Sequence, residues 1–208
     1  MARDLSPIVK RSRREGYALH PKAHKALVKR STMPGQSASG GGRRPPKASQ
    51  YSLQLREKQK VKRLYGLLEK QFSNLMKEAS RTKGQSGQVL LQLLELRLDN
   101  VVYRSGLAMS RRAARQLVTH GHFMLNGRRV DIPSMRVKVG DEIIARDHSK
   151  NTEYFKHIDE VSPASPNDIP GWIKVNRKKL EISVTGVPAR EESEPDINEQ
   201  LIVEYYSR

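Results

Sequence analysis

Arg111, Arg112 and Arg115 follow Ser110 in a segment whose aliphatic residues have helical spacing. At ~100° per residue the arginines lie on a side roughly 140° away from the aliphatic residues. A guanidinium fork binds phosphate through two hydrogen bonds and stacks on bases, and the free N–H groups at a helix start attract anions. An ordinary surface helix with three arginines is the alternative. The spacing predicts an anion-binding face on a helix over residues 110–121, capped by Ser110.

A hairpin is expected directly after this helix. Residues 123–125 and 128–130 flank Asn126-Gly127, a pair typical of a type I′ turn. The turn should bring Asn126, Arg128 and Arg129 close to the arginine-bearing helix. His120 lies at the expected end of that helix, where it could cap the helix or contact RNA.

A second basic stripe lies on a long helix expected from residue 50 onward, with Ser49 or Ser52 as N-cap. Arg56, Lys60 and Arg63 recur at helical spacing, with Lys58 and Lys62 beside them. A single glutamate is interleaved, so the like charges should stay uncompensated. This favours phosphate contact over a solvated face.

The whole chain is strongly basic, and its charge is segregated. The 208 residues carry a formal net charge of +17. Residues 1–90 hold 21 Lys and Arg against 5 Asp and Glu, whereas residues 147–208 hold 8 against 12. Clustered cations release condensed counterions from a nucleic acid, so the partner should be polyanionic. An anionic membrane surface is the alternative, but no strongly amphipathic basic helix with exposed Trp or Phe is evident.

Other site chemistries find no support in the residues. The chain has no cysteine, which excludes disulfides and thiol catalysis. His20 and His24 have metal-ligand spacing without further ligands nearby, and the Gly-rich segment before Arg43 and Arg44 lacks the Lys-Ser/Thr ending of a phosphate-binding loop. No run reaches the ~18 apolar residues of a membrane span. We therefore expect no enzyme, no cofactor and no metal.

The periodicity indicates an α+β fold. Helical spacing extends over residues 50–81, 88–104 and 110–121, with Gly66 as a possible kink. Period-two segments at 123–130, 136–146 and 172–184 predict three antiparallel strand pairs. The segment 198–206 is ambiguous between strand and helix, and we favour a helix capped by Asp196 or Asn198. Residues 31–49 are a Gly/Ser/Pro-rich loop whose arginines, Arg43 and Arg44, could follow a phosphate backbone.

Several stretches resemble a known family. The runs LQLREKQKVKRLYGLLEKQF (53–72), LELRLDNVVYRSGLAMSRRAARQLVTHGHFMLNG (94–127) and DINEQLIVEYYSR (196–208), together with MAR…SRREG (1–16), are similar to bacterial small-subunit ribosomal protein S-four. The middle run is a small RNA-binding motif found in many proteins. The first and last, in this order after a basic N-terminal segment, are highly specific.

The resemblance implies a mainly helical domain with an inserted small α+β RNA-binding domain, two helices followed by antiparallel strands, and an extended basic N-terminal arm. The implied organisation is an arm and Gly/Pro loop at 1–48, a helical domain at 49–92 completed by 191–208, and an inserted domain at 93–190 with its motif at about 93–146. Many family members hold a metal or iron–sulfur cluster on four N-terminal cysteines, and this chain has none.

The implied function is that of a structural constituent of the small ribosomal subunit. It would bind small-subunit ribosomal RNA (rRNA) first, nucleate assembly and help to set translational accuracy near the path by which messenger RNA enters. Ribosomal protein S-five and messenger RNA are further implied partners, on the ribosome of a bacterial cytoplasm or of an organelle. The residues expected to face rRNA are Arg3, Arg13, Arg14, Arg43, Arg44, Arg56, Lys58, Lys60, Lys62, Arg63, Arg97, Ser110, Arg111, Arg112, Arg115, His120, Asn126 and Arg128.

Two other protein classes compete with this interpretation. An RNA-modifying enzyme such as a pseudouridine synthase needs a separate catalytic domain, and only about 60 acidic, loop-interrupted residues follow the motif. A helix-turn-helix DNA repressor needs a recognition helix that continues into helical scaffold, whereas this helix leads into a hairpin. Both are disfavoured.

Overall fold

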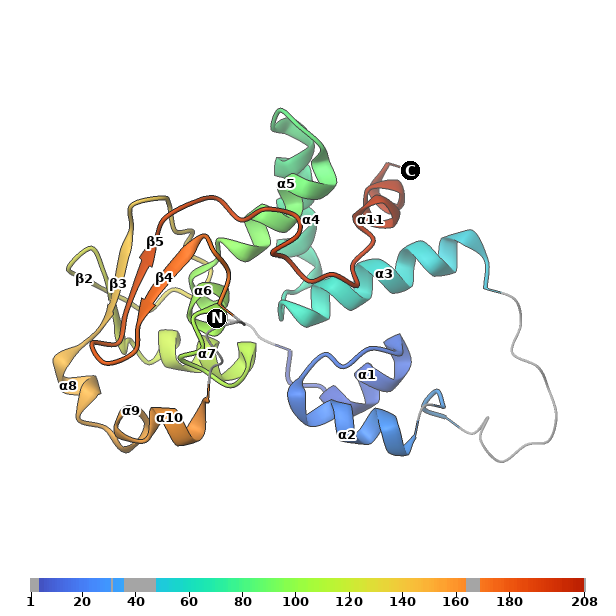
Figure 1. Ribbon diagram of the computed structural model, residues 1–208. Coiled ribbons are helices and arrows are strands. Elements are labelled where there is room, and N and C mark those ends of the chain that lie inside the picture. Colours follow the sequence, from blue (N-terminus) through green and yellow to red (C-terminus); the bar gives the residue numbers. More distant parts are fainter. Residues whose placement is uncertain (1–3, 31, 36–47, 164–168, 208) are drawn as a thin grey trace. The chain divides into compact units, whose positions relative to one another are not determined.

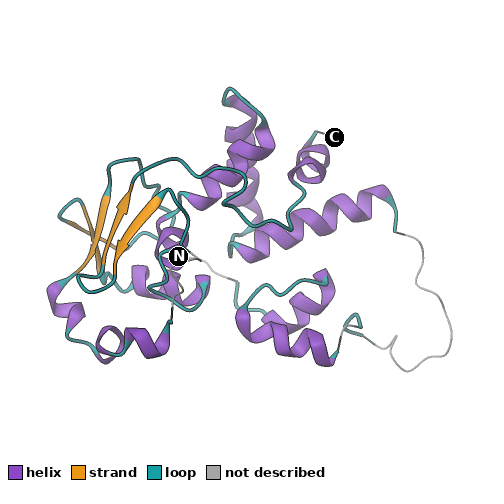
Figure 2. Cartoon of the chain, viewed as in Figure 1, coloured by secondary structure: helices purple, strands orange, loops and turns teal. Residues whose placement is uncertain are grey.

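The computed structural model describes residues 4–30, 32–35, 48–163 and 169–207. The chain forms two compact units, one made of Met1–Val89 with Asp196–Arg208 and the other of Leu90–Pro195. The first is helical and the second combines helices with an antiparallel sheet, as Figures 1 and 2 show. The predicted α+β fold class is confirmed. None of the described helices is long and apolar enough to cross a membrane.

The basic N-terminal segment, expected as an extended arm, contains two short helices, α1 (Ile8–Glu15) and α2 (Pro21–Lys29). Local signals start and stop them, because His20 caps α2 just before Pro21 and proline suits a first helical turn. The buried Ser12 hydroxyl donates to the Ile8 carbonyl and accepts from the Leu19 amide, which ties α1 to the segment that leads into α2. Because a small polar residue makes this contact, no apolar periodicity in the sequence indicated these two helices.

The long helix expected from residue 50 is two helices, α3 (Gln50–Leu64) and α4 (Glu69–Arg81), with Ser49 as the N-cap of α3. Gly66 takes a left-handed conformation with φ of 67°. The Leu67 amide donates to the Lys62 carbonyl at 2.9 Å and the Gly66 amide to the Arg63 carbonyl at 3.2 Å. These two bonds form a Schellman motif, which ends α3.

The C-terminal segment forms the predicted helix, α11 (Glu199–Tyr206), capped by Asn198. It packs on α3 within the first unit (Figure 1). The buried side chains of this unit come from helices that are distant in sequence, and include Val61, Leu64, Phe72, Met76 and Ile202.

The helix predicted over residues 88–104 is also divided, into α5 (Ser86–Glu95) and α6 (Leu98–Arg104). Between them Arg97 is extended and bridges Arg136 in antiparallel fashion. The Val137 amide donates to the Leu96 carbonyl at 2.9 Å, and the Leu98 amide donates to the Met135 carbonyl at 2.8 Å. A partner segment about 40 residues away in sequence therefore interrupts the helix. The next helix, α7 (Arg111–Thr119), lies where it was predicted.

The sheet of the second unit has five antiparallel strands in the order β2-β1-β3-β5-β4. The predicted hairpin is β1 (Phe123–Leu125) and β2 (Arg128–Val130), with positive φ at Asn126 and Gly127 as a type I′ turn requires. The pair β4 (Ile173–Asn176) and β5 (Glu181–Val184) is confirmed as well.

The predicted strand pair within residues 136–146 is wrong in its first half. Only β3 (Glu142–Ala145) is a strand of the sheet, and its neighbours are β1 and β5. Residue 136 instead bridges Arg97. Closeness in sequence suggested a local hairpin, whereas the structure uses distant partners.

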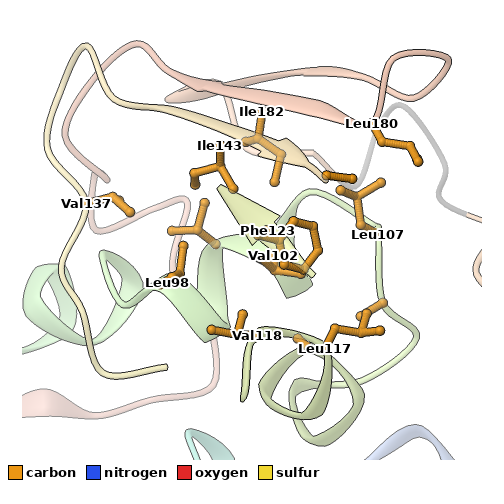
Figure 3. Packing of buried hydrophobic residues seen from close by; sticks show 14 of the residues in the cluster. Leu98, Val102, Leu107, Leu117, Val118, Phe123, Val137, Ile143, Leu180 and Ile182 are labelled. Atoms are coloured by element: carbon orange, nitrogen blue, oxygen red, sulfur yellow. The ribbon is translucent and has the colours of Figure 1, made fainter. Parts of the chain in front are cut away.

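One face of the sheet forms the core of the second unit against α6 and α7. Phe123, Ile143 and Ile182 point into it together with Val102 and Val118 (Figure 3). Three four-residue helices, α8 (Asp147–Lys150), α9 (Glu153–Lys156) and α10 (Ile158–Val161), connect β3 with the last two strands and contribute further buried side chains. Such short helices carry no readable period, and they were not predicted.

Candidate nucleic-acid interface

Helix α7 has the two faces that the sequence predicts. Ala114, Leu117 and Val118 are buried in the core, and Arg112 is exposed on the other side. The Ser110 hydroxyl accepts a hydrogen bond from the Ala113 amide at 3.2 Å, which makes it the N-cap of the helix. Ser110 itself is 4% exposed, so in this structure its hydroxyl serves to cap the helix.

Arg111 points from α7 toward carboxylates of its own chain. Its Nη2 lies 2.7 Å from Glu194 Oε1 and its Nε donates to Asn100 Oδ1 at 2.9 Å. The guanidinium also lies over the Tyr103 ring, 4.5 Å from the centroid. Arg104, which the sequence analysis missed, lies beside it and pairs with the fully buried Glu95 through two hydrogen bonds. The sequence predicted this guanidinium face but not the carboxylates that meet it.

Arg97 and Arg115 share a second carboxylate, Asp99. Arg97 is 5% exposed and binds both Asp99 oxygens, at 3.2 and 3.1 Å. Arg115 Nη1 donates to Asp99 Oδ2 at 3.0 Å. In the protein without RNA the Arg97 guanidinium is thus inside the second unit, where it stabilises the α5–α6 junction.

The hairpin places its cations on the surface. Arg128 and Arg129 are exposed, and Arg129 lies against Gly121, where a Cβ would be 2.8 Å from its Nε. Asn126 has a structural role, because its amide donates to Asp141 and its oxygen accepts from the Glu142 amide. The turn is thereby fixed to the start of β3.

His120 is exposed at the C-cap of α7, with its ring 6.0 Å from that of His122. His122 is less accessible and lies 3.0 Å from Ser149 Oγ through its Nδ1. Burial lowers the pKa of His122, and the neighbouring His120 and Arg146 lower it further. His122 is therefore predominantly neutral at neutral pH and adds no charge to the surface.

The basic stripe of α3 is compensated, contrary to expectation. Arg56 and Arg63 both pair with the buried carboxylate of Glu15, which comes from α1. Burial raises the pKa of Glu15, against the lowering effect of the two arginines. Lys60 pairs with Glu57 at 2.8 Å and donates to the Asp196 carbonyl at 2.6 Å. The expectation that these charges stay uncompensated is wrong, because Glu15 from α1 meets both arginines and Lys60 has acceptors on its own helix and near the C-terminus.

Lys58 and Lys62 converge on Glu69 at the start of α4. Their Nζ atoms lie 2.7 and 2.6 Å from its two oxygens. Burial would raise the pKa of Glu69, but the hydrogen bonds from both lysines outweigh it and lower the pKa to about 2. Lys58 is 3% exposed, with its Nζ 4.7 Å from the centroid of the Tyr205 ring. This lysine holds α11 on α3.

At the N-terminus, Arg13 donates to the Thr32 carbonyl at 2.9 Å through its Nη2, and Arg14 is exposed. Arg3, Arg43 and Arg44 lie outside the described residues. Within the described part of the chain, no cluster of three or more His, Cys, Asp or Glu side chains could hold a metal ion.

These contacts separate two kinds of predicted site residue. Three arginines, Arg14, Arg112 and Arg128, are exposed to solvent. The others are bound to the protein's own acceptors: Arg13, Arg56, Lys58, Lys60, Lys62, Arg63, Arg97, Arg111 and Arg115. Sequence reasoning missed Arg104, whose only signal was its place in a helix just before the arginine-bearing one.

Comparison with known proteins identifies the family. Residues 3–95 match the ribosomal protein S4/S9 N-terminal domain, and residues 96–143 match the S4 domain. The chain is 49% identical over 208 residues to the small ribosomal subunit protein uS4 of Chloroflexus aurantiacus, and 50% over 214 residues to that of Clostridioides difficile. Both matches cover 100% of each chain. The chain therefore belongs to the uS4 family of small ribosomal subunit proteins.

Proposed function

We propose that this non-enzymatic ribosomal protein is a primary binder of small-subunit rRNA that nucleates assembly of the subunit. Membership of the family along the whole chain supports this function. The observation that carries it is the exposure of Arg112 on α7 and of Arg128 and Arg129 on the adjoining hairpin. Exposed guanidinium groups on a rigid helix and a rigid turn suit recognition of folded RNA by its backbone and shape.

The proposed domain organisation is that of the sequence analysis, with an α+β domain inserted into a helical one. The division into two compact units, the first assembled from both ends of the chain, supports it. Each unit carries its own cations, so each unit can bind an RNA element of its own.

We place the protein on the ribosome of a bacterium, because relatives in several bacteria match it along their full length. Ribosomal protein S-five is its proposed neighbour there, near the path of messenger RNA, and a role in translational accuracy follows from that position. Crosslinking within assembled subunits tests the neighbour, and a misreading reporter in cells tests the role in accuracy. Absence of both effects contradicts this finer assignment.

The salt dependence of binding tests the rRNA function. We expect log affinity for in-vitro-transcribed small-subunit rRNA to fall steeply with log salt, since ~0.7–0.9 counterions are released per phosphate contact. Replacing Arg112, Arg128 and Arg129 together by Gln should make the slope shallower by about 2. The matched control is Lys70, Lys77 and Lys83 to Gln, which removes the same charge from exposed positions outside the predicted site.

Two results contradict the proposal. A slope near zero for the native protein excludes binding through many phosphates. Equal slopes for the two triple variants show that the α7–hairpin surface is not the contact. Duplex DNA at the same salt should bind more weakly than rRNA, and equal affinity excludes recognition of RNA shape.

A further inference from the structure

Two arginines of the second unit converge on one carboxylate oxygen. Glu194 Oε1 lies 2.7 Å from Arg111 Nη2 and 3.5 Å from Arg104 Nη2. All three side chains are only partly accessible, at 15%, 13% and 16% of their full exposure. Glu194 thus occupies a small anion site at the beginning of α7.

The two guanidinium groups are held in place by residues other than Glu194. Asn100 and the Tyr103 ring position Arg111. The fully buried Glu95 binds Arg104 through both of its oxygens, at 3.0 and 2.7 Å. Glu95 also accepts a hydrogen bond from the Asn100 amide at 2.7 Å. The site is therefore pre-organised, and its shape does not depend on the anion in it.

Glu194 itself belongs to an irregular segment between β5 and α11. Glu192 anchors this segment by accepting from the Gly171 and Ala189 amides. The Glu194 carboxylate can therefore leave the arginines without breaking a helix or a strand. Carboxylate and phosphate present the same pair of acceptor oxygens to a guanidinium fork.

We propose that Arg104 and Arg111 form a phosphate subsite for rRNA, and that Glu194 is a phosphate mimic that occupies it until RNA displaces it. This inference rests on the proposed function. Its consequence is that every RNA that places a phosphate in this subsite must displace the carboxylate, whereas an RNA that binds elsewhere on the protein is unaffected.

The variant Glu194→Gln tests the mimic, because it removes the charge and keeps the size. We expect the affinity for small-subunit rRNA to rise roughly three- to tenfold, the range of a partly buried charged hydrogen bond. The control Glu191→Gln makes the same charge change three residues away at an exposed position, and should change affinity less than twofold. Glu194→Asp, which keeps the charge, should stay close to the native protein. Transfer RNA serves as the unrelated RNA, and its affinity should rise less than twofold because it does not use the subsite.

A double-mutant cycle with Arg111→Gln separates competition from a structural ion pair. If Glu194 competes with phosphate, Arg111→Gln weakens rRNA binding more in the Glu194→Gln background than in the native one. Equal losses in both backgrounds, or an unchanged affinity for Glu194→Gln while its thermal unfolding stays cooperative, overturns the inference. If Glu194→Gln does not unfold cooperatively, Glu194→Ala, which also removes the charge, takes its place in the same cycle with Arg111→Gln. Failure of the native protein to bind rRNA would instead contradict the proposed function.

Discussion

At the scale of single residues, carboxylates decide which cations of this protein are available to a partner. Asp99 holds both Arg97 and Arg115, and all three are at most 15% exposed in their side chains. A buried ion pair contributes little net stability, but removal of one partner leaves an uncompensated buried charge. Asp99 should therefore tolerate substitution poorly, because the folded protein needs it whether or not RNA is bound.

We predict that Asp99→Asn lowers the free energy of unfolding by about 3 kcal/mol, because Arg97 is left buried without a counter-charge. Denaturant titration measures the loss. Asp131→Asn, at an exposed position, should change stability by less than ~0.5 kcal/mol. A loss below ~1 kcal/mol for Asp99→Asn would show that water or another group compensates Arg97.

At the scale of elements, a single turn divides the long helical segment of the first unit. The Schellman motif at residues 62–67 buries Leu67 and separates α3 from α4. Its Gly66 has open space where a Cβ would lie. The glycine is therefore needed for its positive φ and not for close packing.

Gly66→Ala should consequently destabilise the protein by about 1–2 kcal/mol through backbone strain alone. Gly66→Asn should lose less, because asparagine tolerates the left-handed conformation. The midpoints of chemical unfolding compare the two variants. Equal losses of stability in Gly66→Ala and Gly66→Asn would instead indicate a steric cause. The open space around Gly66 argues against such a cause.

At the scale of the whole molecule, the two units differ in how their chain is assembled. The second unit is one continuous stretch, Leu90–Pro195, whereas the first needs the C-terminal segment. Tyr206 donates to Glu69, and Gln54 donates to Glu204, so polar contacts as well as the buried Ile202 hold α11 on the first unit. Stability of the first unit should therefore depend on the last residues of the chain.

We expect a chain ending at Pro195 to lose amide-exchange protection in α3 and α4 while the sheet of the second unit stays protected. Hydrogen exchange with mass spectrometry measures the protection of the two units separately. Ile202→Ala is the milder variant, with an expected loss of about 2–5 kcal/mol confined to the first unit. Loss of protection throughout the chain would show that the units do not fold independently.

Several features were predictable because their signals are local. Asn126-Gly127 requires a tight hairpin, Ser110 and Asn198 cap the helices that follow them, and α7 shows its two faces through helical spacing. Each signal spans a few residues and reflects backbone conformations that hold in any surroundings. The fold class and the basic surface on α7 and the hairpin follow from such signals.

The remaining features depend on partners far away in the chain. The break at Arg97 exists because residues 135–137 pair with it, and the basic stripe on α3 is neutralised by Glu15 from α1. The amino-acid sequence by itself determined where the cations are and which faces their helices have. Only the tertiary structure decided which of them meet a carboxylate of the same chain, since the Coulomb energy of a pair depends on distance in space and not along the sequence.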